Sequence, residues 1–440
     1  MTGQESPGGP GPGFVDNGDG HVVILHRWQD AYATYEEYVD HRARPVTYIT
    51  PPGGRATVPA SAAEVHETGD LDDYQAVLSA VAASVQRHGA PAAIIALKES
   101  DLPVASRLRE WYGTPGRRPG DLSRFLDKLE MAECVQRLGL PLPEYAPVRD
   151  TRDVEEFAAR HGWPVVVKPR RGSSSRGVVV LRDRDRLAEH TIRPEDGLMV
   201  QAFQQGTVLH VDGLLTPQGL GPWRASAYLD TCLAFAGGAP MGSVELDDRR
   251  LLAQLEQYLE KLIPGLEPTP WTFHLEVFMD DSDPEAVVFT FLEVGARVGG
   301  GEVSWLWREV HGIDLMWTEC AMQFGHLPDA PPLAPDEPVA GFLLYPLPVA
   351  RPCRVTRLTP VTAGPDGPYA VRVPQEGEVL PEADGAYEHT GGRFRFKGKT
   401  TAEVRGRVER ATREFEIHCV PLAADPEVRH NALNTHEAKD

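Results

Sequence analysis

The first 120 residues alternate short apolar runs with amphipathic segments, and this pattern restricts the fold more than any other feature. Apolar runs lie at 21–26, 45–50 and 92–97. The segment 71–89 has apolar residues at helical spacing and ends at a glycine, a usual stop signal. Buried strands that alternate with helices form a parallel sheet covered on both faces. Residues 19–120 are therefore predicted to be a parallel α/β domain.

Beyond residue 120 the pattern changes. A single helix is predicted from about residue 121 to Gly139. The runs 271–279 and 286–294 are separated by the turn-forming residues DDSDPE. Two apolar runs joined by such a turn predict a pair of antiparallel strands.

The C-terminal part and both ends have their own signatures. The Pro-rich stretch 327–338 is predicted to be a boundary, the region 340–396 to be mostly β, and 400–418 to be one helix. The Gly/Pro-rich residues 1–18 and the polar residues 426–440 are predicted to be disordered tails, because such segments bury little apolar surface.

The charge balance and the cysteines exclude several classes of protein. The chain carries 44 basic and 64 acidic residues, a formal net charge of −20, which argues against nucleic acid and against anionic membrane surfaces as partners. No run approaches the length of a transmembrane helix, and the first residues lack the pattern of a signal peptide. The five cysteines lie far apart, which favours reduced thiols. We expect a cytoplasmic enzyme or binding protein.

The most informative motif is a lysine at the end of a buried run, followed at once by a loop of small and basic residues. Lys168 closes the run, and the loop reads Arg170-Arg171-Gly172-Ser173-Ser174-Ser175-Arg176-Gly177. Small residues let backbone N–H groups approach an anion, while hydroxyl and cationic side chains add donors. The segment predicts a phosphate-binding loop that is not a Walker loop. A basic surface loop between two strands is the alternative.

A second motif places acidic residues on the predicted strand pair. His274 and Glu276 stand two residues apart and share one face of a strand, and Glu293 closes the next strand. Carboxylates on adjacent strands can bridge hard cations such as Mg²⁺, and Arg297 offers a planar donor for a phosphoryl or carboxylate group. The alternatives are that the glutamates face solvent and that His274 is a packed structural residue.

Together these segments resemble the ATP-grasp superfamily, specifically its carboxylate–amine ligases such as the bacterial L-amino acid (dipeptide) ligases. The resemblance runs from about residue 20 to about residue 420, with its motifs in the required order. It implies an α/β fold, with the mixed α+β arrangement that ATP-grasp proteins have. The parallel domain at 19–120 would precede a two-part ATP-grasp module at 121–330, with a hinge near residue 200, and a small β-rich cap at 331–425.

The resemblance also implies a role for each motif. Lys128, in a helix before the nucleotide module, would touch the α-phosphate of ATP, and Lys168 the α- and β-phosphates. Glu276 and Glu293 would bridge Mg²⁺, for which Mn²⁺ could substitute. Arg297 would hold the transferred phosphoryl group or the acyl phosphate. His274 would orient the acyl phosphate or accept a proton from the amine. The other residues expected at the nucleotide are Gly172, Ser173, Ser174, Ser175, Gly177, Gln201, Ala202, Phe203, Gln204 and His210.

Three positions depart from the pattern of this family. Gln201 stands where the hinge usually has a glutamate. Val208 stands where an acidic residue usually holds the ribose, which leaves His210 or Asp212 to substitute. Gly295 stands where many relatives have a metal-site asparagine.

The implied reaction transfers the γ-phosphoryl group of ATP to a carboxylate, after which an amine attacks the acyl phosphate. Its partners would be a small carboxylate and an amine, such as amino acids or peptides, in peptide natural-product or antibiotic biosynthesis. A homodimer is left open. The alternatives are a nucleotide-binding module of the same fold without turnover, and a ligase whose acceptor is a longer peptide or an amine on a carrier protein. A biotin-carboxylase-like function is ranked lower, because no biotin-carrier segment is present.

Overall fold

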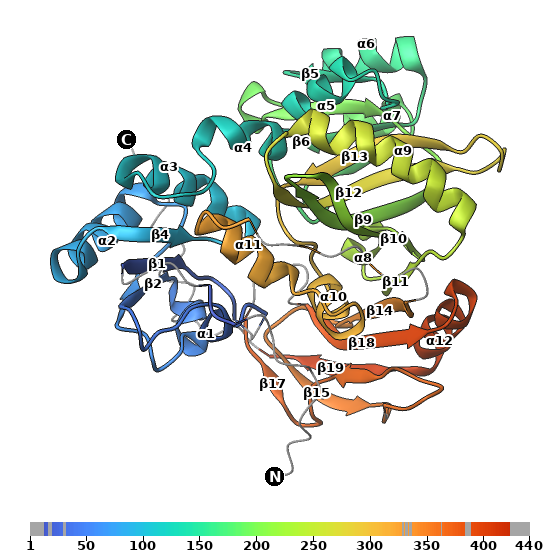
Figure 1. The fold of residues 1–440 in the computed structure, drawn as a ribbon. Helices are drawn as coiled ribbons and strands as arrows, with labels where there is room; N and C mark the ends of the chain where they lie inside the picture. The colour runs from blue at the N-terminus through green and yellow to red at the C-terminus, as the bar shows by residue number, and fades with distance from the viewer. Residues whose placement is uncertain are drawn as a thin grey trace. The chain divides into compact units, whose positions relative to one another are not determined.

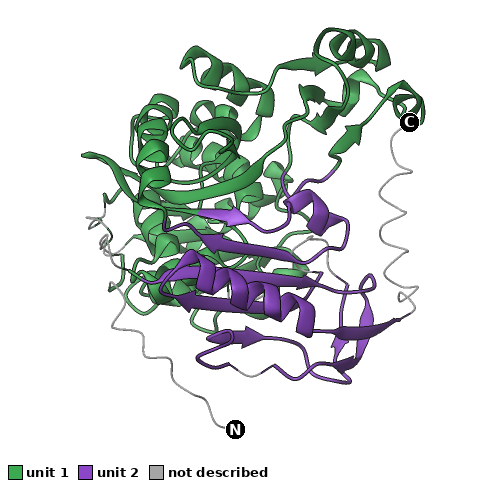
Figure 2. Cartoon of the chain, turned by 90° about the vertical axis from the view of Figure 1, so that its right-hand side faces the viewer, with its two compact units in different colours: residues 1–172, 177–225, 248–337 green, residues 173–176, 226–247, 338–440 purple. Residues whose placement is uncertain are grey.

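The computed structural model describes residues 13–15, 20–29, 32–327, 330, 333, 337–361, 363–382 and 389–422. Contacts along the chain divide it into two compact units, which Figure 2 shows in different colours. Unit 1 comprises 1–172, 177–225 and 248–337, and unit 2 comprises 173–176, 226–247 and 338–440. Each unit is therefore built from segments that are separate in the sequence.

The N-terminal part of unit 1 contains the parallel sheet that the sequence predicts. Its strands lie in the order β3-β2-β1-β4, and all neighbours are parallel (Figure 1). The strands are β1 (His21–Leu25), β2 (Val46–Thr50), β3 (Glu64–Glu67) and β4 (Pro91–Ile95); the helices of this part are α1 (Tyr35–Tyr38), α2 (Tyr74–His88) and α3 (Leu102–Tyr112), with 3₁₀ turns at Pro52–Thr57 and Glu99–Asp101.

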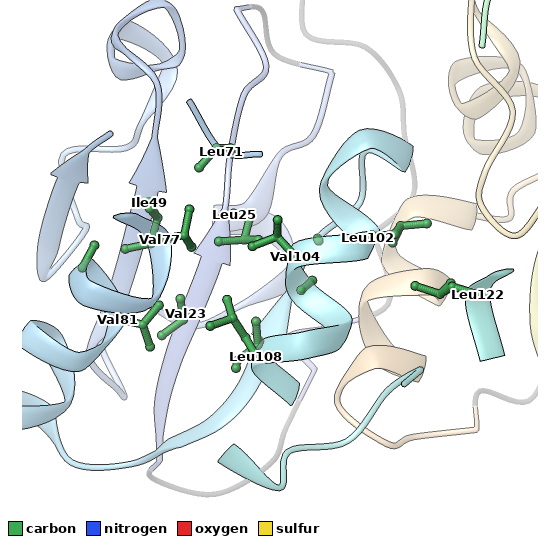
Figure 3. Close-up of a cluster of buried hydrophobic side chains, with 14 residues drawn as sticks. Val23, Leu25, Ile49, Leu71, Val77, Val81, Leu102, Val104, Leu108 and Leu122 are labelled. Atoms are coloured by element: carbon green, nitrogen blue, oxygen red, sulfur yellow. The ribbon is translucent and has the colours of Figure 1, made fainter. Parts of the chain in front are cut away.

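Helices α2 and α3 pack on one face of this sheet because alternate strand residues point toward them. Val23 and Leu25 of β1 lie in one buried cluster with Val77 of α2 and Leu108 of α3 (Figure 3). Helix α2 begins where the Asp73 side chain accepts hydrogen bonds from two backbone N–H groups, the usual way to satisfy a helix start. This cluster is the core that holds the parallel domain together.

The nucleotide module predicted in unit 1 contains two antiparallel sheets. The smaller has the strand order β5-β8-β6-β7, and the larger contributes β13-β12-β9-β10. Their strands are β5 (Tyr145–Val148), β6 (Val165–Pro169), β7 (Val179–Leu181), β8 (Leu198–Ala202), β9 (Thr207–Thr216), β10 (Gly219–Tyr228), β12 (Trp271–Asp280) and β13 (Val288–Gly295). The associated helices are α6 (Thr151–His161), α7 (Arg184–Ala188), α9 (Arg249–Leu266), α10 (Val303–Val310) and α11 (Leu315–Gln323), with a 3₁₀ turn at Pro194–Asp196.

The predicted strand pair at 271–294 is confirmed, but the predicted helix at 121–139 is wrong in one respect. The structure has two helices, α4 (Pro119–Leu126) and α5 (Lys128–Arg137), with Asp127 between them in an extended conformation. The Asp127 side chain accepts a hydrogen bond from Leu129 N, so this residue caps a second helix instead of continuing the first. The break makes Lys128 the first residue of a helix.

Unit 2 contains the region 340–396, which the sequence predicts to be mostly β. The end of β10, from Ser226, pairs with β11, and the order continues β11-β14-β18-β16, while a second small sheet has the order β17-β15-β19. The elements are α8 (Cys232–Ala236), β11 (Met241–Glu245), β14 (Val339–Pro346), β15 (Cys353–Leu358), β16 (Ala370–Arg372), β17 (Val379–Leu380), β18 (Thr390–Gly398), α12 (Thr401–Glu414) and β19 (Ile417–Pro421). The helix predicted at 400–418 therefore ends at Glu414, and its last residues begin a strand.

The predicted tails are only partly within the described residues. Val15 is buried and its N–H donates to the Tyr38 carbonyl, while the Trp317 indole donates to the Gly13 carbonyl. The predicted tail at 426–440 and much of the Pro-rich boundary at 327–338 lie outside the described residues. The helices of the described residues include none that is long and apolar enough to span a membrane.

The core of the parallel domain generates a stability prediction. Leu108→Ala should lower the free energy of unfolding by about 2–5 kcal/mol, because it leaves a cavity in a fully buried cluster. Leu327→Ala is the matched control, because the Leu327 side chain is 58% exposed. Thermal melts of both variants measure the effect. Equal midpoints for the two variants would contradict the packing described above.

Candidate functional site

The two predicted metal carboxylates lie directly opposite each other. Glu276 of β12 pairs with Glu293 of β13 in the antiparallel register, and opposed residues project from the same face of a sheet. The Glu276 residue is buried, with 9% exposed, and the Glu293 side chain is 35% exposed. The structure therefore brings these two glutamates together, as expected for a pair that shares a cation.

Two lysines from other elements interact with these carboxylates, Lys128 through a contact with Glu293 and Lys168 through its charge. Lys128 Nζ lies 3.4 Å from Glu293 Oε2 and donates to the Gly172 carbonyl at 2.6 Å. Lys168, at the end of β6, is only 5% exposed. Burial lowers the pKa of Lys168 to about 8. The negative charge of Glu293 opposes this fall, and repulsion from Lys128 adds to it. Burial acts to raise the pKa of Glu293, but the charges of Lys128 and Lys168 hold it below its ordinary value.

The loop after Lys168 is anchored by Asp127. The Arg170 guanidinium donates two hydrogen bonds to the Asp127 carboxylate, at 3.0 and 2.7 Å, and Arg171 Nε lies 3.6 Å from the same group. Lys128 N also donates to the Arg170 carbonyl at 2.8 Å. Two of the arginines near the loop are thus held at the start of α5, where they help to place Lys128.

The backbone of the loop itself explains its composition. Gly172 and Gly177 have φ values of 123° and 69°, and a Cβ on Gly177 would stand 2.9 Å from a side-chain carbon of Pro169. Ser174 and Ser175 have φ values of 59° and 55°, which are uncommon for residues other than glycine. Left-handed residues of this kind hold local backbone strain. The glycines fit the turns of this loop, and its role in binding phosphate stays a prediction.

The predicted adenine segment lies at the end of β8. Gln201 is buried in the centre of the small sheet, opposite Val166 and Tyr145. Ala202 N donates to the Glu144 carbonyl and Phe203 N to the Pro164 carbonyl. Phe203 is a large apolar side chain that is 39% exposed, and Gln204 follows it.

His274 belongs to a buried network that the sequence alone did not reveal. His274 Nδ1 lies 2.8 Å from one oxygen of Asp212, and His210 Nδ1 lies 2.7 Å from the other. His274 Nε2 lies 3.8 Å from Glu276 Oε1. Burial acts to lower the pKa of His274, but the negative charge of Asp212 raises it above its ordinary value. His210 and Asp212, considered above as ribose contacts, are thus engaged with each other.

Arg297 is paired with an acidic residue that sequence reasoning missed. Arg297 Nε donates to Glu99 Oε2 at 2.5 Å, and its guanidinium also donates to the Val298 carbonyl. A Cβ on Gly295 would stand 3.6 Å from Glu99 Oε2. A longer side chain at position 295 would therefore lie beside the Arg297–Glu99 ion pair. The separation of 198 positions between these partners in the sequence explains why no local motif indicated Glu99.

Gly299 fits closely against the histidine network. A Cβ on Gly299 would stand 2.2 Å from Asp212 Oδ1 and 3.0 Å from His274 Nδ1. The Gly299 carbonyl accepts a hydrogen bond from the Tyr32 hydroxyl at 2.9 Å. The backbone at Gly299 therefore approaches a protein side chain closely, and only glycine fits at this position.

Comparison with known proteins identifies the fold. No protein-family model matches the chain. The L-arginine-specific L-amino acid ligase of Bacillus subtilis is 21% identical over 304 residues, which cover 66% of this chain and 71% of the relative. The first curated relatives in the comparison match over only 11–37% of their own length.

Solved structures cover nearly the whole chain. An L-amino acid ligase from Bacillus licheniformis has a TM-score of 0.66 at 17% identity, and covers 92% of this chain and 99% of its own. A biotin carboxylase complex with β-γ-ATP from Campylobacter jejuni has a TM-score of 0.62 at 14% identity, and covers 91% of this chain and 92% of its own. The chain therefore has the ATP-grasp fold and resembles the carboxylate–amine ligases of that superfamily.

Proposed function

We propose that the protein is an ATP-dependent ligase that joins a carboxylate to an amine through an acyl phosphate and releases ADP and phosphate. The observation that carries the proposal is the cluster in which Glu276 and Glu293 oppose each other, Lys128 contacts Glu293, and the buried Lys168 interacts with both glutamates through its charge. A magnesium nucleotide brings both the cation that the carboxylates would bind and the phosphates that the lysines would bind. The cluster thus complements a ligand that carries both charges.

The donor set fits a hard divalent cation. Glu276 and Glu293 present carboxylate oxygens from neighbouring strands, which Mg²⁺ prefers, and Mn²⁺ could use the same oxygens. Such a cation supplies charge that stabilises the transferred phosphoryl group. The network behind Glu276 would help to orient that carboxylate, because His274 lies within 3.8 Å of it.

The remaining residues would hold the nucleotide. Lys128 and Lys168 would contact its phosphates, and the loop from Gly172 to Gly177, with Ser173, Ser174 and Ser175, would cover them through backbone N–H groups. The segment 201–204 would receive the adenine, with Phe203 offering an exposed ring. His210 would lie near the bound nucleotide, and its hydrogen bond to Asp212 would hold its ring in place. The biotin carboxylase of Campylobacter jejuni, a structural neighbour, forms a complex with β-γ-ATP, which supports a nucleotide as the ligand.

Arg297 and His274 would act on the carboxylate and the amine. Arg297 would bind the acyl phosphate, and Glu99 keeps its guanidinium oriented before substrate arrives. Asp212 holds Nδ1 of His274, so Nε2 is the nitrogen that would orient the acyl phosphate or accept a proton from the attacking amine. No protein nucleophile is required, since positioning and charge stabilisation suffice for phosphoryl transfer.

The finer assignments follow from the relatives. We propose amino acids or peptides as substrates because two of the relatives compared above are L-amino acid ligases, and peptide natural-product or antibiotic biosynthesis as the setting. We also propose the division into a domain at 19–120, a nucleotide module at 121–330 and a cap at 331–425. The second candidate, an ATP-binding module without turnover, is favoured by Gly295 at the position where asparagine is expected.

Product analysis tests the reaction. The protein should release ADP from ATP only when a carboxylate and an amine are both supplied, because the acyl phosphate needs an acceptor. Pairs of amino acids are the first substrates to assay, alone and in combination. ADP and an amide in equal amounts support a ligase, AMP and pyrophosphate contradict the acyl phosphate, and tight ATP binding without turnover supports the second candidate.

The lysine and the glutamates should separate binding from turnover. Lys168→Ala should weaken ATP binding by roughly tenfold to a hundredfold, because a charge-assisted contact is lost. Glu276→Gln and Glu293→Gln should lower kcat more than ATP affinity, with partial rescue at raised Mg²⁺. Lys261→Ala and Glu256→Gln, both exposed on α9, are the matched controls. Wild-type turnover in either glutamine variant would remove the metal assignment.

The lowered pKa of Lys168 predicts a pH dependence of ATP binding without metal. With a pKa of about 8, Lys168 loses its proton as the pH rises through 8, and a neutral amine attracts phosphate less than an ammonium does. ATP affinity measured in EDTA should therefore fall about tenfold between pH 7 and pH 9. Lys168→Arg, whose charge persists, should flatten the profile. An equally steep fall in that variant would assign the titration to another group.

A further inference from the structure

A cavity lies in unit 1, apart from the residues assigned to the nucleotide. It has a volume of about 250 Å³. Helix α3, the start of α4, the first residue of β12 and the end of α11 line it. The side chains that the argument uses are Arg109, Arg117, Asp121, Glu267, Trp271 and Glu319.

Two arginines line the cavity. Arg109 is 1% exposed, and its guanidinium donates to the Ile94 carbonyl and to Gln323 Oε1. Arg117 donates one long hydrogen bond, of 3.5 Å, to the Ala296 carbonyl and lies over the rings of Phe125 and Trp271. Neither arginine forms an ion pair within the part of the chain that the structure describes. Arg109 is buried and Arg117 is partly buried, and the negative charges of Glu319, Glu267 and Asp121 oppose the fall in the pKa of Arg117 that burial causes. A ligand carboxylate at ion-pair distance would complement Arg117 more closely than these side chains do.

Trp271 adds an unused donor at the same place. The residue is fully buried, and its indole Nε1 has no hydrogen-bond partner among the described residues. A buried N–H group without a partner is costly, and most such groups in proteins are satisfied. A carboxylate that accepts hydrogen bonds from Arg117 and Trp271 would satisfy both groups.

The acidic residues of the cavity restrict the ligand further. Asp121, Glu267 and Glu319 line it beside the two arginines, so the formal charge of these side chains is −1. Glu319 accepts hydrogen bonds from Thr272 and Gln323, and Glu267 accepts from Thr269. A simple anion would bind the arginines but would be repelled by these carboxylates. A ligand with both a carboxylate and an ammonium group complements both signs.

We propose that this cavity binds a free amino acid as a zwitterion, with its carboxylate on Arg117 and Trp271 and its ammonium group on the acidic side. The site is separate from the proposed reaction site, because Lys128, Lys168, Glu276, Glu293 and Arg297 are not among its lining residues. Binding needs neither ATP nor metal, so the proposal stands independently of the ligase reaction.

The position of the cavity connects it to the reaction site. Arg117 contacts the carbonyl of Ala296, the residue before Arg297. Glu319 accepts a hydrogen bond of 2.6 Å from Thr272, which lies two residues before His274 on β12. An occupant that draws Arg117 or Glu319 toward itself therefore acts on the two segments that carry Arg297 and His274.

Amino-acid binding to the full-length protein without ATP or Mg²⁺ tests the proposal. The probes are the twenty L-amino acids, and then the amide and the decarboxylated amine of each one that binds, measured by calorimetry and tryptophan fluorescence. Arg117→Met should weaken binding roughly tenfold to a hundredfold and Trp271→Phe about threefold to tenfold, because each removes a hydrogen bond to the carboxylate. Amides and amines should bind at least tenfold more weakly than the acids.

Matched controls separate this cavity from the surface and from the reaction site. Arg152→Met and Trp111→Phe, at exposed positions, should bind as wild type does. Arg297→Ala should retain the binding as well. If Arg117→Met does not fold, Trp271→Phe carries the test with its ring preserved. Absence of binding by every amino acid, unchanged affinity in Trp271→Phe, or loss in Arg297→Ala alone would overturn the proposal.

Discussion

The register of strand β12 between its two neighbours is the constraint on which the candidate site depends. In that register Glu276 lies opposite Glu293 on one side and His210 on the other, and His274 lies opposite Asp212. Side chains alternate between the faces of a sheet, so a slip of one residue would move every one of these groups to the wrong face. The apolar residues between them, Phe273, Leu275 and Val277, are fully buried on the other face and oppose such a slip. The packing that stabilises the sheet therefore also aligns the polar groups.

The charges of the site stabilise one another. Lys168 is buried and Glu293 is partly buried, and each reduces the cost of burial for the other because their charges are opposite. Asp127 stabilises the loop in a similar way, because its carboxylate both caps α5 and binds Arg170. A site of this kind is organised before a ligand arrives, and that organisation is what positioning in phosphoryl transfer requires.

Local patterns in the sequence predicted much of this arrangement. The lysine at the end of a buried run, the small-residue loop and the acidic strand pair each depend on residues close together in the chain, so their spacing was informative. The partners Glu99 for Arg297 and Asp212 for His274 were not predicted, because each pair joins distant segments through the fold. Asp127 shows a third case. The helical periodicity continues across it, and only its capping bond reveals that the helix restarts there.

Gly299 has a consequence for how the sequence can vary. Its α-carbon occupies the space next to Asp212 so closely that a methyl group would overlap the carboxylate oxygen, and its carbonyl is held by Tyr32. The two positions share one small volume, and an increase in size at one requires a decrease at the other. In proteins that share this arrangement, residues 212 and 299 should change together. A chain with a residue larger than glycine at 299 should have a residue other than aspartate at 212.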